Sequence, residues 1–519
     1  TAVCLAFALS ACAGEGHRAN TDKYRNFYEI FVGGFYDSTG NGMGDLNGVT
    51  HCLDYLNDGT KNSLGIDGIW LMPVMPSPTY HKYDVINYMD IDPLYGTLDD
   101  FERLIAECGK RGIAVIIDLV LNHTSTKHPW FMSATASLSV PGCGENICAV
   151  EILCAEHNPY IGYYNFTNEK GVLPDFFILA NGWQYQAVFW DQMPDLNLDD
   201  EKLKEEIVEI TRFWLDMGVA GFRLDAVIEF FDKNAAKNIE FLQWFCGMAQ
   251  SIDPNVYVVC EAWADAGTIE RYYESGADSF FNFPFSNPSG EIVAALRSGN
   301  GSGFAQKIVD WDKRIKNKNP SAIDAPFLSN HDNSRSAGFL MNNLTHQKMC
   351  AAMYLFMPGV PFIYYGEEIG MTGSGRDENK RQPMIWSAND KTGRPYPPSG
   401  ADQQQSLTAG FKEQLKDKNS LLRFYIDAIM LKNKHPEIAR GTPAAVDLGS
   451  RALSAHVSSL NGSSVLIVHN LAGEAAAWSL DILPGEYKLQ GFLTADGGSV
   501  RIRNNDVQMP PYSTAVFKE

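Results

Sequence analysis

Gly221-Phe222-Arg223-Leu224-Asp225-Ala226 is a short apolar run that carries two charged residues near its end. Its length and composition predict a buried β-strand. Side chains alternate along a strand, so Arg223 and Asp225 share one face, and buried charges need partners. An arginine beside an aspartate keeps that carboxylate ionised at neutral pH. The pair is therefore either a structural ion pair at a strand end or an activated carboxylate that attacks a substrate.

Seven further runs of strand length occur in the chain, and predicted helices separate them. Eight strands that alternate with helices predict an α/β fold, a TIM (β/α)8 barrel with insertions. An open doubly wound sheet is disfavoured, because no Gly-rich phosphate turn opens a helix. The expected strands cover residues 27–32, 69–72, 113–120, 221–226, 256–260, 279–283, 326–329 and 360–365.

Two stretches depart from this alternation and predict further domains. Residues 124–192 are rich in Gly, Pro and aromatic residues, and an irregular loop of that length is unusual in a compact domain. We interpret them as an inserted domain B after the third strand, which divides barrel domain A into residues 21–123 and 193–436. Residues 437–519 have an apolar period of two, which predicts a C-terminal all-β sandwich, domain C.

Residues 1–20 are interpreted as an export segment. Their first twelve residues are apolar, too short to span a bilayer, and similar to the apolar region of a signal peptide. Leu9-Ser10-Ala11-Cys12 resembles a bacterial lipoprotein cleavage site, and a polar tether follows. We expect a signal remnant and tether with a lipid anchor at Cys12 as the only membrane contact; a plain secretory signal is the alternative. Both predict an exported protein, either a membrane-anchored lipoprotein at the cell surface or a secreted one.

The formal net charge of −20 disfavours a nucleic-acid partner, because phosphate binding needs a basic face. It suits a neutral substrate. The many aromatic residues, 22 Tyr, 10 Trp and 29 Phe, are what a sugar site would use, although protein cores use them too. We expect a monomer.

Three cysteines, Cys143, Cys148 and Cys154, cluster in the irregular part of the predicted domain B. One disulfide is expected there in an exported protein, and its pairing stays open. His157 nearby raises a Cys/His metal site as the weaker alternative. The other cysteines after the export segment lie in apolar helix or strand patterns and are expected to be buried thiols.

The loop from Asp37 to Asp45 has oxygen-bearing side chains at alternate positions, with Gly residues between them. This spacing is typical of a calcium loop, in which a main-chain carbonyl supplies a further oxygen. A Gly-rich turn without a metal is the alternative. The expected calcium ligands are Asp37, Thr39, Asn41, the carbonyl of Met43, and Asp45.

Acidic residues follow three different predicted strands: Asp225, Glu261 and Asp332. Catalytic groups of a TIM barrel lie at the C-terminal ends of its strands, so these acids are expected to meet at one mouth. Their chemistry fits glycosidic bond cleavage, with Asp225 as nucleophile and Glu261 as proton donor about 5 Å away, the retaining geometry. Glu261 follows an apolar strand and faces other acids, which raises its pKa. Asp332 would stabilise the developing positive charge.

Five motifs in order resemble the α-amylase family, glycoside hydrolase family 13, and the group intermediate between oligo-1,6-glucosidases and neopullulanases. They are Asp118-Leu-Val-Leu-Asn-His123, Met193-Pro-Asp-Leu-Asn197, Gly221-Phe-Arg-Leu-Asp225, Glu261-Ala-Trp263 and Asn330-His-Asp332. The resemblance implies the barrel, domain B and domain C, and it assigns the three acids the same catalytic roles.

The resemblance also implies roles for residues around the acids. Arg223, His123 and His331 would bind the sugar at the cleavage subsite, and Tyr83 would stack on it. Asp84 would be a structural partner. Asn122 would bind an interdomain calcium ion, with Asp195 as a second ligand, and the 37–45 loop resembles another calcium site of the family. No organic cofactor is implied.

The sequence departs from the family pattern just after the Asp225 motif. Many α-amylases carry Lys-His where this chain has Ile228 and Glu229. Ala226 stands where relatives that cleave α-1,6 bonds often carry Val, which favours α-1,4 bonds. We therefore expect an α-1,4-glucan hydrolase acting on starch, maltodextrin or maltooligosaccharides. The alternatives are an exo-acting α-glucosidase, oligo-1,6-glucosidase or transglycosylase, and a non-catalytic glucan-binding relative.

Overall fold

A parallel sheet forms the centre of the molecule in the computed structural model, which describes residues 22–144, 148, 153–171 and 173–519. Its seven strands are ordered β10-β1-β2-β3-β7-β8-β9, and every neighbouring pair is parallel. Their bounds are β1 Phe27–Ile30, β2 Gly68–Leu71, β3 Ala114–Leu119, β7 Gly221–Leu224, β8 Tyr257–Cys260, β9 Ser279–Phe280 and β10 Phe362–Tyr364. Each is an apolar run that is buried on both faces, as parallel sheets require.

The barrel closes through the segment Ala325–Phe327, where the seventh strand was expected at residues 326–329. That prediction is wrong in its extent. Only two isolated parallel bridges form, Phe281 with Ala325 and Phe327 with Phe362. Pro326 has no N–H to donate to a ladder, which limits pairing there, and only its carbonyl bonds, accepting from the Phe362 N–H at 2.9 Å. The TIM barrel itself is confirmed, since the two bridges join β9 to β10.

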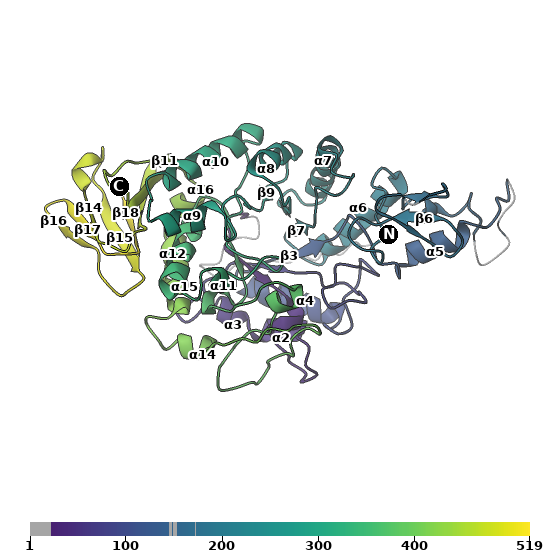
Figure 1. Cartoon of the computed structure of the whole chain (residues 1–519), viewed down its shortest axis with the longest axis horizontal. Helices are drawn as coiled ribbons and strands as arrows, with labels where there is room; N and C mark the ends of the chain where they lie inside the picture. The colour runs from purple at the N-terminus through teal and green to yellow at the C-terminus, as the bar shows by residue number, and fades with distance from the viewer. Residues whose placement is uncertain (1–21, 145–147, 149–152, 172) are drawn as a thin grey trace, which may run out of the picture.

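Helices surround the sheet on the outside (Figure 1). The longer barrel helices are α4 Leu98–Lys110, α6 Glu201–Asp216, α7 Ala235–Ile252, α8 Ala266–Tyr272, α9 Glu291–Ser298, α10 Phe304–Lys318, α12 Leu344–Leu355 and α15 Leu421–Asn433. One of them, α4, begins with a capping box between Thr97 and Asp100. Shorter ones are α1 Val32–Phe35, α2 Leu46–His51, α3 Leu53–Leu56, α11 Ser336–Phe339, α13 Asp377–Lys380, α14 Phe411–Gln414 and α16 Pro436–Arg440.

Between β3 and α6 the chain forms a small separate unit, where domain B was predicted. It contains α5 Pro129–Ser137, the short helix η1 Pro159–Ile161, and an antiparallel sheet β4-β6-β5. The sheet strands are β4 Phe166–Thr167, β5 Phe176–Ile178 and β6 Gln184–Gln186. Phe131, Tyr164 and Tyr185 pack edge to face at its centre. α5 and β6 lie at one end of the molecule, far from the C-terminal strands (Figure 1).

The disulfide expected in this unit is not formed. Cys143 Sγ lies 3.4 Å from Cys148 Sγ and 3.5 Å from Cys154 Sγ, whereas a disulfide bond is about 2.05 Å long. All three are thiols. The five cysteines expected to be buried thiols are confirmed as such: Cys52, Cys108, Cys246, Cys260 and Cys350.

The C-terminal part is the predicted all-β sandwich. One sheet has the order β11-β12-β13-β18-β15 and the other β14-β17-β16. Leu466, Trp478 and Phe517 are buried between them. The bounds are β11 Thr442–Ala445, β12 Leu453–Leu460, β13 Ser463–Asn470, β14 Ala476–Ser479, β15 Lys488–Thr494, β16 Arg501–Arg503, β17 Asp506–Met509 and β18 Ser513–Lys518.

Among the described residues, no helix is long and apolar enough to cross a membrane. The predicted signal remnant, the cleavage site and the anchor at Cys12 lie outside the described residues.

Candidate active site

The guanidinium group of Arg223 joins three carboxylates that come from three neighbouring strands. Its Nη1 donates to Asp118 Oδ1 at 2.7 Å and to Asp225 Oδ1 at 2.6 Å. Its Nη2 forms an ion pair with Glu261 Oε2 at 2.9 Å. The strands β3, β7 and β8 are adjacent and parallel, so their C-terminal ends bring these side chains to one edge of the barrel. The face shared by Arg223 and Asp225, predicted from strand alternation, is therefore the face that meets the other two acids.

The exposed fraction of each side chain distinguishes the residues that support the site from those that face the substrate. The side chains of Arg223 and Asp118 are 0% exposed, whereas those of Asp225 and Asp332 are 12% and 27% exposed. Arg223 and Asp118 therefore lie beneath the mouth, and Asp225 and Asp332 face it. Trp70 packs against the guanidinium of Arg223, with its ring centroid 5.1 Å away.

Asp118 holds the base of the site together. It accepts hydrogen bonds from Trp70 Nε1 at 3.2 Å and from the Tyr83 hydroxyl at 3.1 Å, besides that from Arg223. Burial raises the pKa of Asp118 to about 6, and the charge of Arg223 opposes that rise. Its place in the first motif was visible in the sequence, but the sequence did not show which side chains it orients.

The two carboxyl oxygens of Glu261 differ in their contacts: Oε2 has two partners and Oε1 has none among the described residues. Its Oε2 accepts a hydrogen bond from the Ala226 N–H at 3.2 Å and pairs with Arg223. Its Oε1 is buried and has no hydrogen-bond partner among the described residues. Burial raises the pKa of Glu261 to about 7, with Arg223 opposing the rise and the charges of Asp225 and Asp332 adding to it. A carboxyl group in this state can carry a proton at neutral pH and deliver it from the unheld oxygen.

Ala226 adopts an unusual backbone conformation, with φ of 43°. The left-handed region costs a residue with a side chain about 1–2 kcal/mol. This conformation directs the Ala226 N–H to Glu261, so the backbone after Asp225 also positions the neighbouring acid. Strain of this kind persists where the surrounding structure enforces it.

Asp332 is held by two cations. Arg381 Nη2 donates to its Oδ1 at 2.8 Å, and His331 Nε2 lies 2.9 Å from its Oδ2. Burial raises the pKa of Asp332, but His331 and Arg381 outweigh it and hold the pKa well below its usual value. Burial lowers the pKa of His331, but Asp332 and Glu29 raise it to about 10, so the ring is protonated at neutral pH. The His331 Nδ1 lies 2.5 Å from Glu29 Oε1.

Glu29 and Arg381 were missed by sequence reasoning. Glu29 is an isolated charge within the apolar run of β1, a signal that points to a buried partner. Arg381 follows α13 in an irregular polar stretch with no periodic pattern, so nothing in the sequence places it at the mouth.

The predicted sugar-binding residues lie around the acids. The Tyr83 hydroxyl is 2.7 Å from His331 Nε2, and the two rings stack with centroids 5.6 Å apart. Burial lowers the pKa of His123, and its buried Nε2 has no hydrogen-bond partner among the described residues. Its contact with the sugar stays a prediction. Asp84 Oδ1 accepts from Ser77 Oγ at 2.6 Å, while its Oδ2 is buried without a hydrogen-bond partner among the described residues, so its structural role stays a prediction.

The loop 37–45 fits calcium only in part. Asp37 accepts hydrogen bonds from the N–H groups of Thr39, Gly40 and Gly42. Asp45 accepts from Ser38 and from the Gly48 N–H at the start of α2, and the Asn41 side chain accepts from the Met43 N–H. The loop is therefore held by its own N–H groups, and it offers two carboxylates in the described geometry. Calcium at this place stays a prediction.

Asn122 and Asp195 are brought together as predicted. Asn122 Nδ2 donates to Asp195 Oδ1 at 3.0 Å, and the Val188 N–H donates to Oδ2 at 3.0 Å. Burial raises the pKa of Asp195 to about 7. Asp195 lines a cavity of about 450 Å³ together with Glu229 and Asp232. Both Asp195 oxygens already accept hydrogen bonds, so what favours calcium here over the loop is the burial of this carboxylate among other acids, which a cation would stabilise. Calcium at this place also stays a prediction.

The site can cleave a bond to an acetal carbon. It presents a carboxylate paired with an arginine, a carboxyl group that holds a proton at neutral pH, and a third carboxylate held ionised at the rim. Two carboxyl groups bridged by one guanidinium cannot be far apart. A nucleophile and a proton donor close together are the two groups that a retaining glycosidase needs.

Comparisons with known proteins agree with this chemistry. A family model described as "Alpha amylase, catalytic domain" matches residues 29–441, and one described as "Alpha-amylase SusG C-terminal domain" matches residues 453–516. Alpha-amylase 3 of Dictyoglomus thermophilum is 35% identical over 509 residues, which cover 97% of this chain and 95% of that protein. The solved structure of Eubacterium rectale Amy13B is 40% identical, with a TM-score of 0.89 over 96% of each chain. Oligo-1,6-glucosidase of Parageobacillus thermoglucosidasius is 26% identical over 546 residues, which cover 87% of this chain and 91% of that protein.

Proposed function

Because the chain belongs to the α-amylase family of glycoside hydrolases, we propose that it cleaves α-1,4-glucosidic bonds of starch, maltodextrin or maltooligosaccharides. The proposed reaction retains the anomeric configuration and passes through a covalent glycosyl-enzyme intermediate. The observation that carries this proposal is the Arg223 bridge between Asp225 and Glu261, together with the unheld Glu261 Oε1.

In the first step an oxygen of Asp225 attacks the anomeric carbon and forms an ester bond to the sugar. The bond from that carbon to the glycosidic oxygen breaks, and the proton of Glu261 moves to the leaving oxygen. Asp332, held ionised by His331 and Arg381, stabilises the positive charge that develops on the sugar ring. The leaving chain departs as an alcohol.

In the second step a water molecule gives its proton to the ionised Glu261 and attacks the same carbon. The ester bond to Asp225 breaks, and the hydrolysed sugar leaves. Glu261 regains its proton, so the site returns to its starting state. Two displacements on one carbon preserve the configuration of the bond that was cut.

The bond type rests on two observations. The relative Alpha-amylase 3 and this chain share 35% identity over nearly their whole lengths, and Ala226 follows the nucleophile. The relative named oligo-1,6-glucosidase and the residues Ile228 and Glu229 support the alternative of an exo-acting α-glucosidase, oligo-1,6-glucosidase or transglycosylase. A non-catalytic glucan-binding role is disfavoured, because all three acids are present and arranged for reaction.

Chromatography of the products separates these possibilities. The proposal expects starch and maltotriose to be cut and isomaltose to remain intact. Release of glucose alone from chain ends would show an exo-acting α-glucosidase and not the proposed starch hydrolase. Cleavage of isomaltose in preference to maltotriose would overturn the assignment of α-1,4 bonds, and longer oligosaccharides among the products would indicate transglycosylation.

The pH dependence of kcat/KM is expected to fall on the alkaline side with an apparent pKa of about 7. Glu261 must be protonated to act as the acid, and burial raises its pKa to that value. Each further pH unit would lower kcat/KM about tenfold, because the protonated fraction falls tenfold. Initial rates on maltotriose or a longer maltooligosaccharide, whose sugar leaving group needs a proton, measure this from about pH 5 to about pH 9. Circular dichroism over the same range checks that the fold persists, and a kcat/KM that stays constant to the alkaline end would contradict the role of Glu261.

We propose that calcium stabilises the protein, with Asn122 and Asp195 as the better-fitting site and the 37–45 loop as the second. Removal by EGTA is expected to lower the melting temperature, because a ligand at a hundredfold excess over Kd stabilises by about 2.7 kcal/mol per site. Differential scanning fluorimetry with EGTA, and again after calcium is restored, measures the shift. Asp195→Asn should reduce it. An unchanged melting temperature, in protein that holds no calcium as purified, would show that both sites are wrong.

Export through a lipid anchor at Cys12 or as a secreted protein, and a monomeric state, belong to the same proposal. The glucan is then met outside the cell, where polymers too large to enter are first cut.

A further inference from the structure

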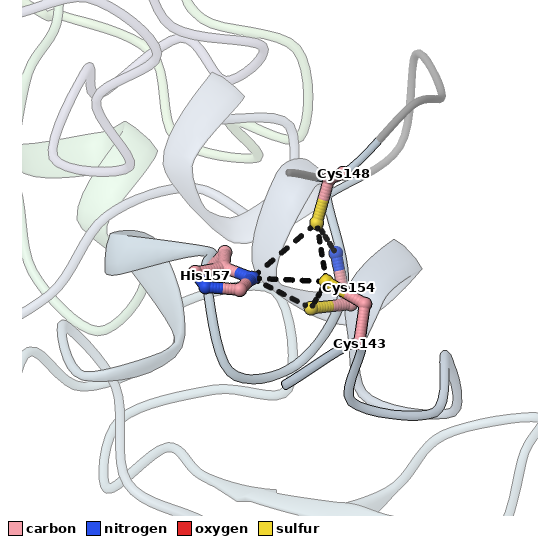
Figure 2. A group of neighbouring side chains, drawn as sticks. All are labelled: Cys143, Cys148, Cys154 and His157. Atoms are coloured by element: carbon pink, nitrogen blue, oxygen red, sulfur yellow. Dashed lines mark hydrogen bonds between the residues drawn. The ribbon is translucent and has the colours of Figure 1, made fainter. Parts of the chain in front are cut away.

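Four side chains of domain B converge on one point: Cys143, Cys148, Cys154 and His157 (Figure 2). Their three sulfur atoms and the His157 Nδ1 all lie within 4.8 Å of one another. Among the described residues, this is the group of cysteine, histidine and acidic side chains that meets the geometry of a metal site. It plays no part in the proposed catalytic reaction.

The distances within the group are those of ligands around a shared ion. His157 Nδ1 lies 3.2 Å from Cys143 Sγ, 3.5 Å from Cys148 Sγ and 3.2 Å from Cys154 Sγ. Zinc bonds of about 2.3 Å to sulfur and about 2.0–2.1 Å to nitrogen, at tetrahedral angles, put the ligand atoms roughly 3.5–3.8 Å apart. The observed contacts are close to these separations, and a small expansion of the group would admit the ion.

The ligand set selects the metal. Three thiolates and one imidazole are soft or intermediate ligands, which suit zinc and do not suit calcium or magnesium. Four protein ligands fill a tetrahedral shell and leave no open position, as in structural zinc sites. A disulfide would use two of the three thiols and would leave the histidine without a role.

The backbone between the ligands is shaped to present them. The N–H groups of His157 and Asn158 both donate to the Cys154 carbonyl at 3.1 Å, and this turn brings Cys154 and His157 to the same side. Cys154 is 3% exposed, while His157 is exposed. Figure 2 shows the four side chains pointing inward to a common centre.

The group is also tied to the helix before it. Ser137 Oγ, at the end of α5, donates to the Leu153 carbonyl at 2.7 Å. Asn158 Nδ2 donates to the Ser133 carbonyl at 3.0 Å and to Ser137 Oγ at 2.7 Å. The ligands therefore lie on the connection between α5 and η1, and a bound ion would join its two ends.

We propose that Cys143, Cys148, Cys154 and His157 bind one Zn²⁺ ion, which fixes the connection between α5 and η1 in domain B. The ion closes a loop of the chain in a part of the structure with little regular secondary structure. Such a cross-link stabilises mainly by limiting the freedom of the unfolded chain. The inference does not depend on the proposed glucan specificity.

The test measures bound metal in the full chain, expressed without a polyhistidine tag and purified without added metal. Inductively coupled plasma mass spectrometry is expected to find about one zinc ion per chain, and His157→Ala and Cys148→Ser are expected to lower that value to near zero. His51→Ala, at an exposed histidine at the end of α2 in the barrel, should keep the zinc. Refolding with Co²⁺ in place of zinc should give the visible absorption bands of a tetrahedral thiolate site in the wild type and not in His157→Ala.

His157→Ala separates the metal from a disulfide, because it leaves all three thiols in place. A disulfide would appear in the intact mass as the loss of two hydrogen atoms and would survive this substitution. That result, or iron in place of zinc, or no metal in freshly purified protein that binds no added zinc, would overturn the proposal. A second readout is limited proteolysis, in which removal of zinc should speed cleavage between α5 and η1 while activity on a short maltooligosaccharide persists.

Discussion

Asp225→Asn is expected to lower kcat on starch by about 10⁴-fold or more while the protein stays folded. The amide cannot form the ester bond to the anomeric carbon, so the first displacement has no nucleophile. Asn has the same size and can accept a hydrogen bond from Arg223 through its oxygen, which preserves the arrangement around the guanidinium. Initial rates on starch measure the loss, and titration calorimetry with a maltooligosaccharide should show that binding persists.

Asp265→Asn is a matched control for this experiment. Asp265 is the N-cap of α8, close after Glu261 in the chain, and its carboxylate accepts from the N–H groups of Gly267 and Thr268. Asn caps a helix about as well as Asp, so this variant should keep both stability and activity. Near-normal turnover in Asp225→Asn would remove Asp225 from the role of nucleophile.

Glu261→Gln is expected to lower kcat on starch by about 10³–10⁴-fold, the upper part of the range for loss of a general acid. The effect should depend on the leaving group. An aryl glycoside with an acidic phenol leaves without a proton, so its first displacement should slow far less than that of starch. The burst of released phenol, followed by slow turnover of the glycosyl-enzyme, distinguishes the two steps. The alkaline fall in kcat/KM should also disappear, because the group that titrates near pH 7 is gone.

Glu240→Gln provides the control for this substitution, since Glu240 is an exposed residue on α7 outside the site. It should leave both substrates and the pH profile unchanged. Equal losses of activity on starch and on the activated aryl glycoside would mean that Glu261 does not act as the proton donor.

The barrel was predictable because its strands are short apolar runs, and three of them, β3, β7 and β8, carry an acidic residue or lead directly into one. The runs near residues 113–120 and 221–226 became β3 and β7 almost in full, and their order in the sheet follows from the order in the chain. The position of the acids then follows from topology alone. The network around them could not be predicted in the same way. Arg381 comes from an irregular stretch, and the contact of Glu29 with His331 joins residues that are 302 positions apart.

The cysteine cluster is a second place where the sequence alone could not decide the structure. Three nearby thiols in a chain expected to be exported favour a disulfide by compartment alone. The choice between a disulfide and a metal depends on where the side chain of His157 points, which is a matter of tertiary geometry. The C-x4-C-x5-C-x2-H spacing is compatible with a metal site, but it is the convergence of all four ligand atoms that favours a metal over a disulfide.

The two bridges that close the barrel bear on how the protein could lose its activity. β3 is paired over four residue pairs with each of its neighbours, whereas Ala325–Phe327 has a single bridge on each side. The closure is held mainly by side-chain packing, since Ala325 and Phe327 are 0% and 1% exposed, and few strand bridges alone do not make a segment open before the rest. Asp332 follows this segment, so an opening of the closure would withdraw the charge stabiliser from Asp225 and Glu261 while the other strands stay paired. Loss of activity through this closure would therefore not require the bulk of the barrel to melt.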